Sequence, residues 1–126
     1  MISTVRSGVL LVFLAALGGC SLCGNRILLR QASPMRAWTA VVYERDCGAT
    51  TPVYTVVELL PRGKDGPDEN DPGGVVISFR NPQDVSVQWA DDSHLRVVCS
   101  SCRGVNLATE RTKVNSVAIE YVLVGQ

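Results

Sequence analysis

Apolar residues recur at every second position over long stretches of the chain after residue 25, and this alternation limits the fold more than any other feature. Val85, Val87 and Trp89 share one side of an extended segment, whereas Ser86 and Gln88 share the other. A period of two is typical of a half-buried β-strand, and no segment shows a convincing helical period. The alternation therefore predicts an all-β protein.

About seven segments have the composition of strands. They are residues 26–31, 35–46, 53–60, 75–79, 85–89, 95–99 and 114–124. Turn-forming residues separate them, among them Ser33-Pro34, Asn81-Pro82 and Asp91-Asp92-Ser93. Because short turns join consecutive strands into antiparallel pairs, we expect a small antiparallel meander curled into a barrel or a sandwich. Residues 104–110 are a weak helix candidate and are not counted among the strands.

The size and charge of the chain favour one globular domain without a nucleic-acid partner. The chain has 126 residues, of which 46% are hydrophobic and 19% are charged, a balance that is typical of globular proteins. Twelve basic residues balance twelve acidic ones, so there is no basic excess to bind a phosphate backbone.

The N-terminal segment differs from the rest of the chain. One basic residue, Arg6, precedes an apolar run from Val9 to Leu17, which is the order found in export signals. As a helix, the uninterrupted stretch of residues 8–23 would rise only about 24 Å, whereas the hydrocarbon core of a bilayer is roughly 30 Å thick. A permanent transmembrane span is therefore disfavoured.

The motif Leu17-Gly18-Gly19-Cys20 resembles the lipobox of bacterial lipoproteins. In that motif a signal peptidase cuts before the Cys, whose thiol carries diacylglycerol, and two or three acyl chains give a lasting membrane anchor. We expect a lipoprotein signal peptide over residues 1–19, a lipidated tether over residues 20–25 and a single β-rich domain over residues 26–126. Ordinary cleaved secretion and an uncleaved anchor are the alternatives. Ser21 follows the Cys, and in a Gram-negative host a residue other than Asp there favours passage to the outer membrane.

Four cysteines remain for the exported domain once Cys20 carries lipid: Cys23, Cys47, Cys99 and Cys102. An even number of thiols in an oxidising compartment is typical of disulfides, and four cysteines allow three connectivities. Their spacing favours Cys23–Cys47 together with Cys99–Cys102. The first bridge would tie the tether to the turn after an early strand, and the second pair is already close in sequence.

The motif Cys99-Ser100-Ser101-Cys102 also raises the hypothesis of a thiol–disulfide exchange site. The low thiolate pKa of such sites usually comes from a helix N-terminus or from nearby cations. Arg103 is adjacent, but the residues after it make a poor helix. We therefore interpret the pair as a structural disulfide, with exchange chemistry and metal binding as the alternatives.

The densest polar patch is the block Arg-Asp-Cys-Gly-Ala-Thr-Thr, which covers residues 45–51. One interpretation makes Arg45, Asp46, Thr50 and Thr51 a small binding site beside a disulfide. The interpretation that we favour uses the threonine hydroxyls to satisfy the backbone of a turn and pairs Arg45 with Asp46 at the surface.

Two further features have a structural and a functional interpretation. Residues 62–74 form the longest connection, rich in Gly, Pro and acids, and we expect an exposed, mobile loop there. Its acidic residues are Asp65, Asp68, Glu69 and Asp71, and because they lack the spacing of an EF-hand, a solvated loop is favoured over a cation site. His94, the only histidine, lies at an expected junction of turn and strand, where a structural role is favoured over a catalytic one.

Parts of the chain resemble a group of small bacterial envelope proteins. Cys23-Gly24-Asn25 and residues 45–51 match motifs of that group closely, and residues 85–95 fit its late strand ending in Trp more loosely. The chain departs from the group at Met35-Arg36, where the group has Asp-Gly, and Cys99 and Cys102 fall outside the pattern. The resemblance implies that Cys23 and Cys47 are partners, and it brings no activity with it.

These observations favour a protein without catalytic activity. The sequence contains no nucleophile elbow, phosphate loop or zinc-protease helix motif, and we expect neither a metal nor another cofactor. We expect a cell-envelope lipoprotein that is anchored to the membrane by its lipid and binds or braces another envelope protein. In a Gram-negative host it would lie on the periplasmic face of the outer membrane. A periplasmic thiol–disulfide exchange protein that uses Cys99 and Cys102 is the alternative.

Overall fold

The computed structural model describes residues 23–67, 71–102 and 107–124. Within these residues the chain forms nine strands and one short 3-10 turn, η1 (Pro72–Gly74). The strands are β1 (Gly24–Ala32), β2 (Trp38–Asp46), β3 (Tyr54–Pro61), β4 (Val75–Arg80), β5 (Val85–Asp91), β6 (His94–Cys99), β7 (Leu107–Glu110), β8 (Lys113–Val114) and β9 (Val117–Leu123). The prediction of an all-β fold is confirmed.

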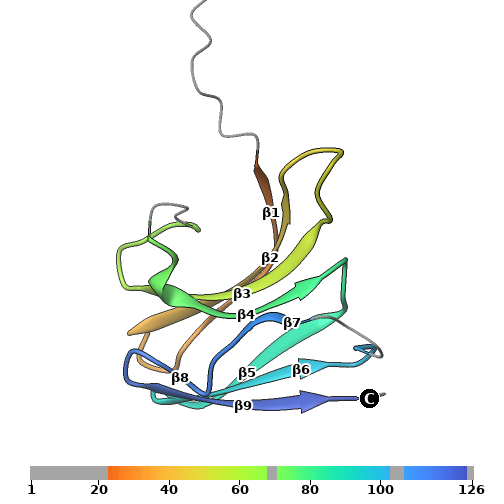
Figure 1. The fold of residues 1–126 in the computed structure, drawn as a ribbon. Helices are drawn as coiled ribbons and strands as arrows, with labels where there is room; N and C mark the ends of the chain where they lie inside the picture. Colours follow the sequence, from red (N-terminus) through yellow and green to blue (C-terminus); the bar gives the residue numbers. More distant parts are fainter. Residues whose placement is uncertain (1–22, 68–70, 103–106, 125–126) are drawn as a thin grey trace, which may run out of the picture.

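The strands form two sheets that lie one above the other (Figure 1). The first sheet has five strands in the order β1-β2-β3-β4-β7, and the second has four in the order β5-β6-β9-β8. Neither sheet closes on itself, so the fold is a sandwich and the alternative prediction of a barrel is wrong.

The predicted meander is only part of the topology. Strands β1 to β4 pair antiparallel in chain order, as expected, but β6 pairs parallel with β9 and β7 returns to pair with β4. Residues 107–110 are therefore a strand and not the weak helix that the sequence suggests. The backbone N–H and C=O groups of β4 pair with β3 on one side and with these residues on the other. The single strand expected over residues 114–124 is a tight hairpin of β8 and β9, in which Asn115 adopts a φ of 52°.

The main core lies between the two sheets, where the inward sides of both sheets form one buried cluster. Its largest fully buried members include Phe79, Leu59, Ile77, Leu95, Val97 and Val117. In β5, Val85 and Val87 are buried and Ser86 and Gln88 are exposed, which confirms the alternation predicted for this strand. A sandwich of this kind is the simplest way to cover the apolar side of each sheet.

A second apolar cluster lies on the other side of the first sheet. Its buried members are Val41, Tyr43, Val56 and Leu60. Glu58 is also buried, and its Oε1 accepts a hydrogen bond from the hydroxyl of Tyr43 at 3.2 Å. Both sides of β2 and β3 are therefore largely buried, which explains why their sequences read as apolar runs rather than as a clean alternation.

The acidic loop after β3 is tied to the sheet. Arg30 of β1 donates to the backbone oxygen of Asp65 at 2.6 Å, and Lys64 forms an ion pair of 3.2 Å with Asp71. Asp65 and Asp71 are exposed, as predicted, whereas Asp68 and Glu69 lie outside the described residues. The mobility of the loop stays a prediction.

Tyr121 of β9 forms hydrogen bonds at the connection between β7 and β8, where the chain passes from the first sheet to the second. Its phenol oxygen accepts from the N–H of Arg111 at 3.2 Å and lies within hydrogen-bond reach of the carbonyls of Arg111 and Val76. Partial burial raises the pKa of Tyr121 to about 12. Because the neutral phenol is the form that the fold favours, its contribution to stability is complete below the ordinary pKa near 10 and is lost as the pH rises toward 12.

The segments on which the predicted export signal depends lie outside the described residues. These are residues 1–19, for the signal peptide, and residues 20–22, which begin the tether. Within the part of the chain that the structure describes, no helix is long and apolar enough to cross a membrane.

Candidate functional site

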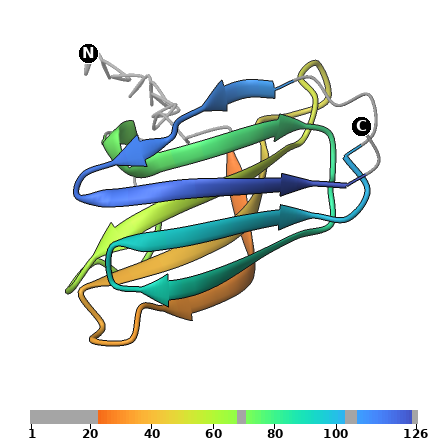
Figure 2. The ribbon, with the colours of Figure 1, turned by 90° about the horizontal axis from the view of Figure 1, so that it is seen from below.

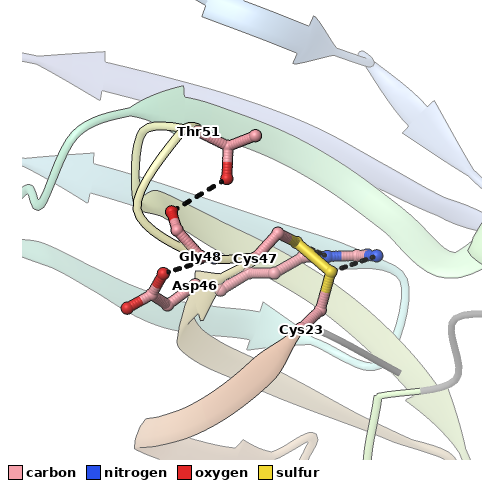
Figure 3. The surroundings of a disulfide bond; sticks show 6 residues. Cys23, Asp46, Cys47, Gly48 and Thr51 are labelled. Atoms are coloured by element: carbon pink, nitrogen blue, oxygen red, sulfur yellow. Dashed lines mark hydrogen bonds between the residues drawn. A yellow bond between two sulfur atoms is a disulfide. The ribbon is translucent and has the colours of Figure 1, made fainter. Parts of the chain in front are cut away.

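The first predicted disulfide closes the start of β1. Cys23 and Cys47 are bonded (Figure 3), and they lie one position beyond Gly24 and Asp46, the pair at which the β1–β2 ladder opens. The antiparallel pairing of two strands joined by a hairpin therefore brings the two cysteines together. The pairing predicted from the spacing of the cysteines is confirmed.

The polar block of residues 45–51 covers the last two residues of β2 and the turn that follows, beside this disulfide (Figure 3). The side chain of Asp46 accepts from the N–H of Gly48 at 3.0 Å, and Thr51 donates its N–H and its hydroxyl to the carbonyl of Gly48 at 3.2 and 3.3 Å. Gly48 has a φ of 114°, a conformation that strains any residue with a side chain. Asp46 and Thr51 are thus used to satisfy the turn, and Thr50 lies exposed in it.

Arg45 lies against the disulfide. Its Nε is 3.5 Å from the sulfur of Cys47 and its Nη2 is 3.7 Å from the sulfur of Cys23. The sequence predicts that Arg45 pairs with Asp46, but the hydrogen bonds seen for these two side chains lead to different groups. A binding role for the block stays a prediction.

The second predicted disulfide joins Cys99, the last residue of β6, to Cys102. Both cysteines are fully buried and belong to the main core cluster. Ser100 between them is exposed, and it donates its hydroxyl to the carboxylate of Asp84 at 3.0 Å and its N–H to the carbonyl of Asp84 at 3.3 Å. Both sulfurs therefore lie in the core, below a turn that is bonded to the start of β5.

A third polar group, which the sequence did not identify as a site, lies on the outer side of the second sheet. Figure 2 shows the strands of this sheet seen from below. Gln88 of β5, Arg96 of β6 and Glu120 of β9 are in register and form one row across three strands, and all three are exposed. In the neighbouring row, His94 lies opposite Ala118. Because Ala118 and the nearby Ala90 carry only methyl groups, the surface is hollowed between their longer neighbours.

We call this depression the outer hollow. It has a volume of about 310 Å³. It is lined by Gln88, Trp89, Ala90, His94, Leu95, Arg96, Ala118, Ile119 and Glu120.

Opposite charges in the outer hollow are paired. The Nε of Arg96 lies 3.3 Å from a carboxylate oxygen of Glu120, and the side chains are 49% and 64% exposed. An ion pair with this exposure contributes about 0–1 kcal/mol at most, so it orients the two groups more than it stabilises the fold.

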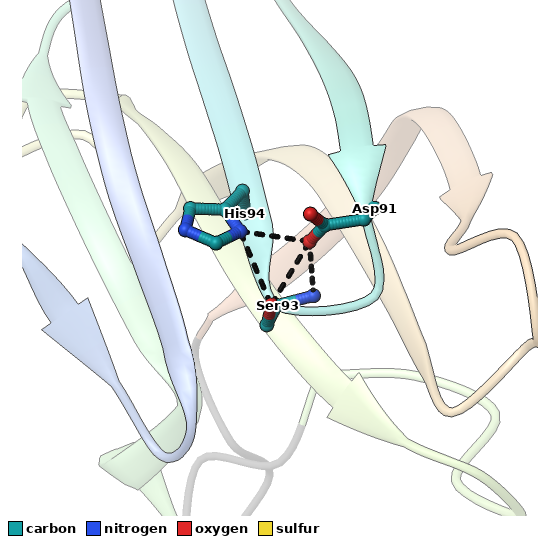
Figure 4. A network of polar contacts seen from close by, with 3 residues as sticks. All are labelled: Asp91, Ser93 and His94. Atoms are coloured by element: carbon teal, nitrogen blue, oxygen red, sulfur yellow. Dashed lines mark hydrogen bonds and ion pairs between the residues drawn. The ribbon is translucent and has the colours of Figure 1, made fainter.

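His94 is held in place by the turn that precedes it (Figure 4). Its Nδ1 lies 2.8 Å from Oδ1 of Asp91 and 3.1 Å from the hydroxyl of Ser93. The same carboxylate oxygen accepts from the N–H and the hydroxyl of Ser93 at 2.8 and 2.9 Å. The structure thus places His94 at the start of β6, at the predicted junction of turn and strand.

These three residues do not have the geometry of a catalytic triad. In a triad the carboxylate binds Nδ1 of the imidazole and the serine hydroxyl binds Nε2, so that a proton can pass from serine to histidine. Here the carboxylate of Asp91 and the hydroxyl of Ser93 both meet Nδ1. The cluster fixes the imidazole and leaves Nε2 on the side away from both groups (Figure 4).

The hydrogen bonds of this cluster lower the pKa of Asp91, and a titration of Asp91 can therefore test them. The hydrogen bond from His94, followed by those from the N–H and hydroxyl of Ser93, lowers the pKa of Asp91 from 3.8 to about 2. These hydrogen bonds to the ionised carboxylate stabilise the fold at pH values above the ordinary pKa of 3.8. Their contribution is lost as the pH falls toward 2 and the carboxylate is protonated. We expect an NMR titration of the Asp91 carboxyl carbon to give a midpoint near 2 in the native protein and a higher midpoint in His94→Ala. A midpoint that His94→Ala leaves unchanged would contradict the contact.

Within the described residues, no three His, Cys, Asp or Glu side chains gather in a way that could hold a metal ion. Comparison of the chain with protein-family models, with curated proteins and with solved structures finds no match.

Proposed function

We propose that this chain is a lipid-anchored, non-enzymatic binding protein of the bacterial cell envelope. The observation that carries the proposal is the position of the first disulfide relative to the lipobox. Cys20 is the residue that would carry lipid, and Cys23, only three residues later, is bonded to Cys47, the residue that follows β2. The anchor would therefore be followed at once by a cross-linked domain rather than by a long flexible linker.

A tether this short gives the domain an orientation at the membrane. Three residues span at most about 10 Å, so the start of β1 and the turn after β2 would lie at the bilayer. From there β1 runs over nine residues, roughly 25–30 Å, to its other end. At that end the indole of Trp89 donates to the carbonyl of Gln31 at 2.9 Å, and the N–H of Met35 donates to Asp92 at 3.0 Å. The turn that holds His94 thus lies at the end of the sandwich away from the proposed anchor.

The position of the outer hollow supports a binding role. The hollow opens on the outer side of the second sheet, which is the lower layer in Figure 1, whereas β1 begins at the top. A protein anchored through Cys20 would present this surface away from the bilayer, where a ligand or partner can reach it.

The alternative, thiol–disulfide exchange at Cys99 and Cys102, has less support. Exchange begins when a thiolate of the partner attacks one sulfur of the disulfide, so that a sulfur has to be reachable. Both cysteines are 0% exposed. A buried bridge of this kind is typical of a structural role.

Replacing the lipid-bearing residue tests the proposed anchor. In a bacterial host, we expect the native chain to fractionate with membranes and to enter the detergent phase, because two or three acyl chains bind a bilayer durably. Cys20→Ser should remain uncleaved at the lipobox or enter the aqueous phase. Ser21→Ala, which leaves the thiol in place, is the matched control and should behave as the native chain. A native chain found in the aqueous phase would contradict the proposal.

A further inference from the structure

The outer hollow has a row of side chains suited to one class of ligand. We propose that it binds an uncharged, hydroxyl-rich ligand, namely a sugar ring of a glycan. This inference rests on the binding role proposed above and gives it a ligand class. Three observations support it: the chemistry of the row, the pairing of its charges and the shape of the floor.

The row of Gln88, Arg96 and Glu120 offers donors and acceptors side by side. An amide donates and accepts, a guanidinium only donates and a carboxylate only accepts. Neighbouring hydroxyls of a sugar each donate and accept, so planar side chains of these three types can bond them in pairs. Neighbouring strands lie about 4.8 Å apart, so the row extends over about 10 Å, the length of one or two sugar rings.

The charges in the outer hollow favour an uncharged ligand. Arg96 and Glu120, the two side chains of opposite charge in its row, are paired with each other. A charged ligand would have to compete with one partner of a pair, whereas a hydroxyl can bond both partners without separating them. The contact to Glu120 runs through Nε of Arg96, and a guanidinium has five N–H donors, so donors remain for a ligand.

The floor suits the apolar side of a sugar ring. Ala90 and Ala118 contribute methyl groups, and the imidazole of His94 stands beside them, oriented by Asp91 and Ser93 (Figure 4). The volume of about 310 Å³ is at the small end of the range for ligand pockets and fits a short glycan segment rather than a large cofactor.

The test uses the isotope-labelled full chain in micelles of a detergent without a sugar headgroup. The probes are two neutral disaccharides, cellobiose and N,N′-diacetylchitobiose, and two charged sugars, glucuronate and glucosamine. We expect at least one neutral disaccharide to shift the amide signals of β5, β6 and β9, with an affinity that added salt does not change, because screening acts on charges. If both neutral sugars leave the amide signals unshifted, or if a charged sugar binds more tightly in a salt-dependent way, the proposal is wrong.

Two substitutions show whether binding occurs in the hollow. Ala118→Leu fills the floor without removing a polar group, and it should weaken binding of the neutral sugar by about tenfold or more. Ser86→Leu places the same side chain on the same side of β5 but outside the hollow, and it should leave the affinity unchanged. Equal affinities of Ala118→Leu and the native chain would overturn the proposed site. Since the micelle experiment does not depend on membrane insertion, its failure is distinguishable from failure of the lipid anchor.

Discussion

Replacing Phe79 with Ala should lower the free energy of unfolding by about 3–5 kcal/mol. Phe79 of β4 is fully buried in the cluster between the two sheets, so the change removes a large apolar side chain and leaves a cavity. Because small domains are stable by only about 5–15 kcal/mol, this loss is a large part of the total. Urea unfolding followed by tryptophan fluorescence measures it.

Leu28→Ala is the control for this substitution. Leu28 lies on the edge strand β1 and is 44% exposed, so its truncation should change the stability by no more than about 0.5 kcal/mol. Similar losses for Phe79→Ala and Leu28→Ala would show that the space between the sheets is not the core.

Removing the first disulfide should have an effect of similar size. In the chain-entropy account, a bridge that closes a loop with a sequence separation of 24 stabilises the fold by roughly 3 kcal/mol. We therefore expect the double variant Cys23→Ala, Cys47→Ala to unfold at a clearly lower urea concentration than the native chain. The two proteins should become equal in a strong reductant, which opens the bridge in the native chain as well. A difference that persists under reduction would assign the loss to packing rather than to the cross-link.

Much of the fold could be predicted from the sequence because local pattern and tertiary structure agree there. The alternation of β5 indicates a sheet with one buried and one exposed side. The spacing of Cys23 and Cys47 is that of a hairpin whose two strands have their free ends side by side. The parallel pairing of β6 with β9 has no such local signal. After β6 the chain leaves the second sheet, pairs as β7 with β4 of the first sheet, and returns to the second sheet as β8 and β9. Because β7 has only four residues, its pairing with β4 decides that it is a strand.

The candidate site was missed for the same reason. The alternation alone places Gln88 on an outward side, but only the parallel pairing brings Arg96 beside Glu120. Likewise, the turn from Asp91 to His94 could be predicted as a turn, whereas the convergence of two side chains on one nitrogen of His94 required the backbone geometry. By contrast, the predicted role of Thr51 needed only the local chemistry of a turn.

Mass spectrometry of the N-terminal peptide shows whether Cys20 anchors this domain to the membrane. The protein is isolated from the membrane fraction of a bacterium that processes lipoproteins, and the mass of the peptide that contains Cys20 is measured. We predict a chain that begins at Cys20, with diacylglycerol on its thiol and with or without an acyl chain on its amine. A chain that retains residues 1–19, or one that begins elsewhere and leaves Cys20 without lipid, would show that Cys20 is not a membrane anchor.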